Sequence, residues 1–205
     1  MIIAFSGIDG SGKSSVASEV EKHFNFKGKP TKLVYVGEYF LLKYPVKLLH
    51  LVLKTKFEGI KENPNQNPFL GIKKRPFYVK LWVIFVLIDN WLNYIRMTFW
   101  SVSGYTVICD RYFYDKLVGF EYHGYSNNLL SKMFLSLMPM PNYFIVLDIT
   151  PELANEREVS KAHNLQFYKT LKEIYFKWLP KNHILIKVEN KKLKDVVKES
   201  LKIID

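Results

Sequence analysis

The chain has 205 residues, of which 48% are hydrophobic and 16% aromatic, a composition that excludes a disordered protein and suits one α/β domain. Its single cysteine, Cys109, excludes an internal disulfide framework and predicts a reducing compartment. The formal net charge of +11 favours anionic partners without choosing among nucleotides, nucleic acid and acidic lipid.

The chain begins with an apolar run, residues 1–5, which predicts a buried strand. The residues that follow fit G-x-x-x-x-G-K-[ST], a phosphate-binding loop, and apolar side chains at every fourth position then predict a helix. Glycines let such a loop turn its N–H groups toward an anion, and the helix dipole adds positive potential. We expect ATP to bind here, at Gly7, Ile8, Asp9, Gly10, Ser11, Gly12, Lys13, Ser14 and Ser15.

The middle of the chain combines apolar and basic residues. Residues 32–36 predict a second strand, and residues 41–57 predict a basic helix interrupted near Pro45, packed on the sheet or bound at a membrane surface. A loop and a short basic segment that ends near Arg75 follow. Residues 77–103 predict a long central helix, buried on most sides; its charged residues leave an apolar run too short for a membrane span.

Three more strands are predicted in the second half, at 105–109, 143–147 and 183–188. Helical segments lie between them up to residue 138, from Pro151 to about residue 161, and at 165–179; a helix at 191–204 closes the chain. Five short strands that alternate with helices predict a doubly wound parallel sheet in three layers, α/β/α, with ligands at the carboxyl ends of the strands. The chain shows no repeat and no linker, so we expect one domain, 1–205.

Three motifs resemble those of the thymidylate kinase family. They are the loop from Phe5 to Ser15, the sequence Asp110-Arg111-Tyr112 after the third strand, and residues 147–157, which read L-D-x-x-P-E-x-A-x-x-R. The resemblance covers nearly the whole chain. It implies a P-loop kinase fold with a short lid at about 152–166, and transfer of the ATP γ-phosphoryl group, with Mg²⁺, to a nucleoside monophosphate, first of all thymidylate.

The resemblance also assigns roles to individual residues. It makes Lys13, Asp9, Arg111 and Arg157 the catalytic residues, and Ser14 and Asp110 the metal ligands. The charges suit this chemistry, because phosphoryl transfer depends on positioning and on neutralising phosphate charge. The acceptor is expected to contact Asp9, Glu38, Asp110, Arg111, Tyr112 and Arg75.

The chain departs from the family pattern on the acceptor side. The family's T-R-E-P-G is here Val36-Gly37-Glu38-Tyr39, Asp115 replaces a serine, and the lid lacks the arginines that usually accompany a glycine at position 10. The remaining acid, Glu38, leaves a second hypothesis open: a deoxynucleoside kinase in which this carboxylate removes a proton from a hydroxyl acceptor. A third hypothesis is a nucleotide-binding module without catalysis.

Partners follow from the same observations. We expect ATP and a nucleoside monophosphate, and no nucleic acid, since no aromatic residues interleave with arginines. The long central helix is apolar enough to leave a free face, and family members commonly pair through helices of this kind, so a homodimer is expected. The cytoplasm is the expected location.

Overall fold

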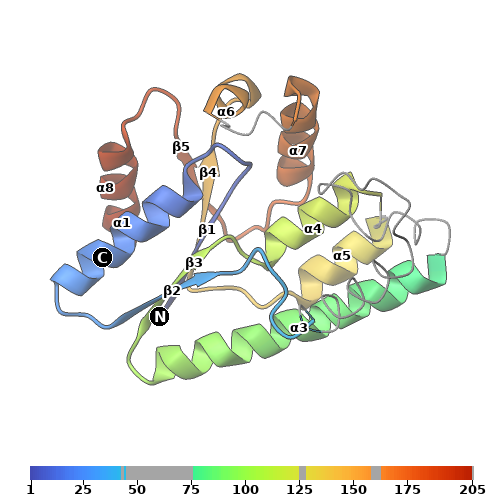
Figure 1. The fold of residues 1–205 in the computed structure, drawn as a ribbon, viewed down its shortest axis with the longest axis horizontal. Helices are drawn as coiled ribbons and strands as arrows, with labels where there is room; N and C mark the ends of the chain where they lie inside the picture. The colour runs from blue at the N-terminus through green and yellow to red at the C-terminus, as the bar shows by residue number, and fades with distance from the viewer. Residues whose placement is uncertain (43, 45–75, 125–127, 158–162, 205) are drawn as a thin grey trace, which may run out of the picture.

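A computed structural model of the chain describes residues 1–42, 44, 76–124, 128–157 and 163–204 (Figure 1). Its centre is a five-stranded sheet in the order β2-β3-β1-β4-β5, with every neighbouring pair parallel. The strands are β1 (Ile2–Ser6), β2 (Thr31–Tyr35), β3 (Thr106–Asp110), β4 (Tyr143–Asp148) and β5 (Ile184–Lys187). The doubly wound α/β class is confirmed, and the strands lie within a residue or two of their predicted positions.

Helices cover both faces of this sheet, because the central strands are apolar on both sides. One face carries α1 (Lys13–Phe26) and α8 (Leu193–Ile204), which enclose a core that contains Phe5, Phe24 and Ile186. The other face carries α3 (Pro76–Val102), α4 (Phe113–Tyr122), α5 (Asn128–Leu137) and α7 (Leu165–Lys177). The short α6 (Pro151–Arg157) follows β4 and lies beside α7 above the sheet (Figure 1).

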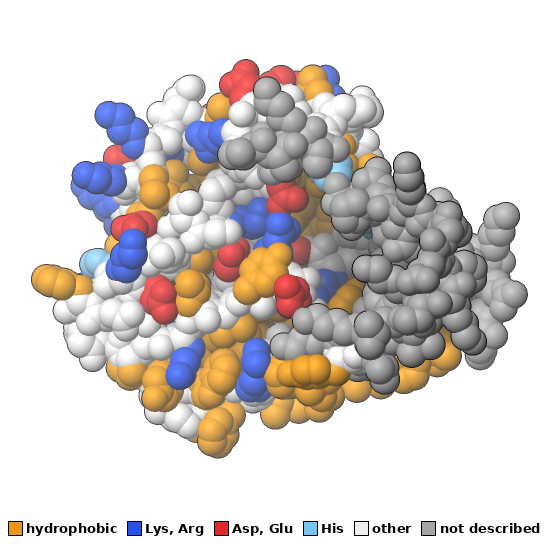
Figure 2. Space-filling model, in the orientation of Figure 1, with side chains coloured by type: hydrophobic (Ala, Val, Ile, Leu, Met, Phe, Trp, Pro, Cys, Tyr) orange, Lys and Arg blue, Asp and Glu red, His pale blue; other side chains and the backbone are white. Residues whose placement is uncertain are grey.

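Two predictions for the middle of the chain have different outcomes. The long central helix is confirmed as α3, but the prediction that it is buried on most sides is wrong. Only one side of α3 packs on the domain, and the helix leaves apolar side chains exposed at Ile84, Phe85, Ile88, Ile95, Phe99 and Val102. We call these six residues the α3 stripe; hydrophobic side chains gather along this edge in Figure 2. The predicted basic helix at 41–57 lies almost wholly outside the described residues.

In the part of the chain that the structure describes, no helix is both long enough and apolar enough to cross a membrane. The α3 stripe is exposed on the surface of the described part of the chain. Contiguous exposed apolar patches usually mark an interaction site.

The buried side of α3 holds the chain that leaves β2. The carboxylate of Asp89, which is 2% exposed, accepts hydrogen bonds from the backbone N–H groups of Phe40 (2.7 Å), Leu41 (2.6 Å) and Leu42 (3.0 Å). A buried carboxylate needs such donors, and the N–H groups at the start of a turn need an acceptor. Asp89 thus fixes the segment after β2 against the central helix.

We predict that Asp89→Ala lowers the free energy of unfolding by roughly 2–4 kcal/mol, because it leaves backbone N–H groups buried without an acceptor. Asp89→Asn keeps one acceptor oxygen and should cost less. Urea denaturation followed by circular dichroism measures both.

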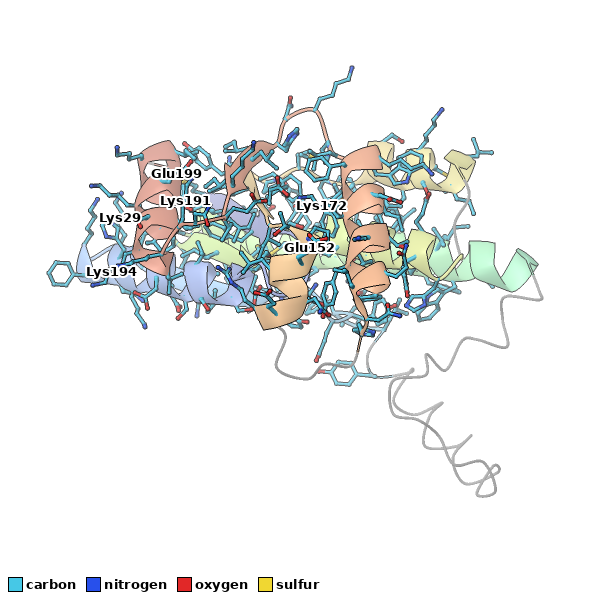
Figure 3. All side chains as sticks on the ribbon, turned by 90° about the horizontal axis from the view of Figure 1, so that it is seen from above. Lys29, Glu152, Lys172, Lys191, Lys194 and Glu199 are labelled. Atoms are coloured by element: carbon cyan, nitrogen blue, oxygen red, sulfur yellow. The ribbon has the colours of Figure 1, made fainter. Side chains whose placement is uncertain are left out.

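The matched control is Glu199→Ala on α8. Glu199 pairs with Lys191 at the surface (Figure 3), and a surface pair of this kind contributes at most about 1 kcal/mol. Equal losses in the Asp89 and Glu199 variants would contradict the anchoring role of Asp89.

Candidate functional site

The loop between β1 and α1 has the backbone that its glycines predict. Gly7, Gly10 and Gly12 have φ values of 143°, 83° and 87°, a region that side chains disfavour. A Cβ atom on Gly7 would lie 2.6 Å from the Leu147 carbonyl oxygen, and one on Gly10 would lie 2.6 Å from the Ala154 carbonyl oxygen. The loop therefore packs directly against β4 and against α6.

Lys13, the first residue of α1, is buried beneath this loop. Its side chain is 5% exposed, and Nζ donates a hydrogen bond to the Ile8 carbonyl (2.8 Å) and lies 3.5 Å from Oδ1 of Asp9. Burial lowers the pKa of Lys13, and the nearby Arg111 guanidinium lowers it further. A buried ammonium held at a glycine-rich loop is suited to bind an anion, because further negative charge stabilises its protonated form.

Arg111 follows β3 and lies on the other side of Asp9. Its guanidinium donates to Oδ1 of Asp9 and lies 3.7 Å from Oδ1 of Asp115. Burial opposes the charge, but Asp115 and Asp9 outweigh it and raise the pKa of Arg111, which stays protonated. Burial likewise acts to raise the pKa of Asp9, yet Lys13 and Arg111 bring it below its usual value. Asp9 is thus a carboxylate between two cations.

The backbone of Arg111 is strained at the end of β3. Its φ of 67° lies in the left-handed region, which costs a non-glycine residue of order 1–3 kcal/mol. A hydrogen bond from its N–H group to the Phe5 carbonyl (2.9 Å) keeps the residue beside β1 despite this cost. The strain directs the guanidinium toward the loop that holds Asp9.

The carboxylate of Asp115, 5% exposed, joins the elements around the site. Its Oδ2 accepts hydrogen bonds from the Ser6 hydroxyl (2.7 Å) and from the N–H group of Tyr112 (2.8 Å). Its Oδ1 meets the hydroxyl of Tyr175, which also lies 3.0 Å from the Gly7 carbonyl; the single hydroxyl hydrogen serves one of them at a time. Asp115 thereby connects β1, the start of α4 and α7.

Asp110 and Ser14 fit a magnesium ion. Asp110 ends β3 beside Phe5 of β1, and its Oδ1 is buried with no hydrogen-bond partner among the described residues. Ser14 is exposed in the first turn of α1. Mg²⁺ binds hard oxygen ligands and usually takes only one or two from protein, with water and phosphate for the rest. Within the described segments, no cluster of three or more His, Cys, Asp or Glu residues could hold a metal ion.

Two adjoining cavities extend from the loop. The inner cavity, about 160 Å³, is lined by loop residues including Gly7 and Asp9 and by side chains of α4 and α7. The outer cavity, about 230 Å³, is lined by aromatic rings and polar groups from the end of β2, from α3 and from α4. Arg111 and Asp115 line both. The cavities therefore form one continuous site with these two charged residues at the junction.

The outer cavity contains a residue that sequence reasoning missed. Lys116 of α4 is 8% exposed, and its Nζ donates to Oδ1 of Asn90 (2.9 Å). A lysine on a helix is normally read as a surface residue. The available signal was its spacing, since Lys116 lies three residues after Phe113 and four before Phe120, on the apolar face of α4.

Three other predicted residues, Glu38, Arg157 and Tyr112, are not among the residues that line the cavities, although Glu38 lies between two that are, Gly37 and Tyr39. Glu38 is exposed and is not among the lining residues, and Arg157 is exposed at the end of α6. Tyr112 is fully buried in the core, where its hydroxyl donates a hydrogen bond to the Pro139 carbonyl (2.8 Å). Tyr112 therefore packs in the core and does not face a ligand. Arg75 lies outside the described residues, as does part of the expected lid, 158–162.

The described part of the lid is fixed at its base. Lys172 of α7 forms an ion pair with Asp148 at the end of β4 (2.7 Å) and donates to the Ile149 carbonyl (3.0 Å). Glu152 of α6 lies 3.7 Å from Lys169 of α7, and Figure 3 shows Glu152 and Lys172 on these neighbouring helices. α6 thus stands over the loop with its position set by α7.

Comparisons with known proteins agree with this geometry. The family model described as thymidylate kinase matches residues 99–200, just under half of the chain. A protein of Archaeoglobus fulgidus named as a probable thymidylate kinase is 25% identical over 100% of this chain and 95% of its own length. The solved thymidylate kinase of Candida albicans is similar in fold, with a TM-score of 0.68 at 17% identity, over 99% of this chain and 90% of that one. A deoxyadenosine kinase from M. mycoides with bound dATP has a TM-score of 0.56 at 14% identity, over 100% of this chain and 99% of that one.

We predict that Gly10→Ala weakens ATP binding by roughly tenfold or more, because the new Cβ both strains the backbone and pushes α6 away from the loop. Calorimetric titration with ATP and Mg²⁺ measures the dissociation constant.

Gly28→Ala is the matched control, since Gly28 also has a positive φ, 71°, while a Cβ there meets nothing within 4 Å. Gly28 follows α1, is not among the residues that line either cavity, and should accept alanine with ATP binding intact. Unchanged ATP affinity in Gly10→Ala would show that contact between the loop and α6 does not shape the site.

Proposed function

We propose that this chain, a divergent member of the thymidylate kinase family, transfers the γ-phosphoryl group of ATP, with Mg²⁺, to a nucleoside monophosphate. Thymidylate is the first acceptor to expect. The products are ADP and the nucleoside diphosphate.

The observation that carries the proposal is the junction of the two cavities. On one side, Lys13 and the loop N–H groups can hold the phosphates of the donor. On the other side, Arg111 lies between the loop and the outer cavity, so it can hold an acceptor phosphate while the nucleoside extends outward. The arrangement brings two phosphorylated ligands together end to end.

The reaction needs little covalent help from the protein. An oxygen of the acceptor phosphate forms a bond to the γ-phosphorus of ATP, and the bond from that phosphorus to the β–γ bridging oxygen breaks, with its electron pair leaving on ADP. Lys13 and Arg111 neutralise charge on the donor and acceptor phosphates. When bound at Asp110 and Ser14, Mg²⁺ would supply further positive charge at the donor phosphates.

The two alternatives predict different acceptors. Hydroxyl phosphorylation requires a base at the acceptor, and Glu38, the candidate, is exposed and is not among the residues that line the outer cavity. The exposure of Glu38 favours the monophosphate kinase. A module without catalysis could hold a nucleotide and its metal through the same buried Oδ1 of Asp110, so turnover is the measurement that separates it from a kinase.

We expect ADP release in the presence of ATP, Mg²⁺ and thymidylate, and a loss of roughly a hundredfold to a thousandfold in kcat for Lys13→Met, which keeps the length of the side chain and removes its charge. A panel of nucleoside monophosphates and free deoxynucleosides, assayed for ADP, tests the proposal.

Thermal unfolding should show that Lys13→Met is folded. Turnover confined to free nucleosides, and abolished in Glu38→Gln, would replace the proposal with hydroxyl phosphorylation. Tight ATP binding without turnover on any acceptor would favour the binding module.

We also propose that two copies of the chain pair through the α3 stripe. The stripe is a continuous apolar surface on one helix, and two such helices can cover each other about a two-fold axis. Pairing would remove from water side chains that are 45% exposed at Ile84, 58% at Ile95 and 70% at Phe99.

We predict that the wild-type protein sediments as a dimer at micromolar concentration and that Ile88→Arg with Ile95→Arg sediments as a monomer, because buried unpaired charge opposes association. Analytical ultracentrifugation measures the mass.

Phe26→Arg serves as the control, since Phe26 is 93% exposed at the end of α1, away from the stripe. A monomeric wild-type protein, or a dimer that survives both stripe substitutions, would disprove this interface.

A further inference from the structure

Lys116 is a buried cation at the outer end of the site. It lines the outer cavity together with aromatic rings from Tyr39, Trp82 and Phe120, and it does not line the inner cavity beside the phosphate-binding loop. Among the described residues, no carboxylate lies within ion-pair distance of its ammonium. Lys116 therefore faces the end of the site that the nucleoside of an acceptor would occupy, on the proposed function.

Part of the hydrogen-bonding capacity of the Lys116 ammonium is already used within the protein. One N–H donates to Oδ1 of Asn90 (2.9 Å), and the ring of Tyr39 lies 5.0 Å from Nζ. An ammonium has three donors and no acceptor, so any further partner must be an acceptor. A ligand group that meets Lys116 from the cavity must therefore present a lone pair.

Asn90 carries a second donor behind Lys116; it is 1% exposed and is not among the residues that line the cavity. Because its Oδ1 accepts from Lys116, its Nδ2 carries the amide hydrogens, and this Nδ2 is buried with no partner among the described residues. Buried polar groups without partners are rare in folded proteins. The pair of Lys116 and Asn90 thus holds unused donors between α3 and α4.

The cavity is of the right kind for a nucleobase. Its volume of about 230 Å³ is smaller than the roughly 300–1,000 Å³ of pockets for drug-sized ligands, as suits a group as small as a single base. Aromatic rings of α3, α4 and the segment after β2 line it. Aromatic walls bind any base by stacking, without distinguishing one from another. Discrimination must come from polar groups on the wall, and Lys116 is one of these.

We propose that Lys116 selects acceptors whose base presents a carbonyl oxygen to it, and disfavours those that present an amino group at that position. Thymine and uracil carry this oxygen, whereas cytosine carries an amino group in its place. The inference rests on the proposed function and names the residue that would read the base.

Deoxyuridylate and deoxycytidylate test this directly, because their bases differ at the carbonyl or amino group and at the neighbouring ring nitrogen, which carries a hydrogen in uracil and a lone pair in cytosine. Wild-type protein should favour deoxyuridylate in kcat/KM. Lys116→Met should reduce that preference by roughly tenfold to a hundredfold, the effect of one charge-assisted hydrogen bond, with the KM for ATP unchanged. Lys116→Arg, which keeps a cationic donor, should retain part of the preference.

The pH dependence gives a second readout on the unmodified protein. Burial lowers the pKa of Lys116 to about 8, while Asp89 acts to raise it. The ammonium is present below this pKa, so the preference for deoxyuridylate should fall as the pH rises through about 8. The titratable or charged groups that face Lys116, or that line the cavity with it, are Asp89 of α3, Tyr35, Tyr39, Arg111, Asp115 and His123.

Lys177→Met is the matched control, because Lys177 of α7 pairs with Glu121 outside the cavity. Equal losses for both acceptors in Lys116→Met would show a structural or phosphate-binding role and overturn the inference while the proposed function stands. If no monophosphate is phosphorylated at all, the proposed function fails, and the inference fails with it.

Discussion

The carboxylate of Asp115 is the contact on which the geometry of the site depends. It accepts hydrogen bonds from the end of β1 and from the start of α4, meets the hydroxyl of Tyr175 on α7, and lies close to the Arg111 guanidinium. A carboxylate buried in this way is stable only if donors surround it. The same requirement holds Arg111 in its strained conformation, which places a cation between the two cavities.

Several ionised groups share one small volume next to the loop, because groups of opposite charge lie beside one another there. Asp9 lies between Lys13 and Arg111, and each cation lowers the cost of burying it. The two cations repel each other, which is part of the reason that the pKa of Lys13 is lowered. Phosphate would relieve this repulsion, so the site is arranged to gain stability from the ligand that its backbone is shaped to hold.

The sequence predicted the geometry of the loop after β1 much better than it predicted the lining of the outer cavity, for a physical reason. The donor loop is local: its glycines, Lys13 and the start of α1 are neighbours in the chain, and their backbone geometry follows from residue type. The acceptor cavity joins the end of β2, α3 and α4, which are far apart in sequence. Position on an apolar helical face was the only sign that Lys116 is buried, and nothing in the pattern showed that Asp89 would anchor the chain after β2. The exposure of the α3 stripe also depends on packing. An apolar helix has the same sequence pattern whether its outer side meets solvent, a second chain or a core.

The contrast between a local loop and a cavity built from distant elements affects how specificity can change within such a fold. On the proposed function, the donor side would depend on backbone N–H groups and on one lysine, so few substitutions there would leave it working. The acceptor side depends on separate side chains, each of which can be replaced while the loop remains intact. Asp115 and Lys116 are neighbours at the start of α4; Asp115 lines both cavities, and Lys116 lines the outer one alone. On the proposed function, this pair of neighbouring residues would connect the position of the acceptor phosphate to the choice of acceptor.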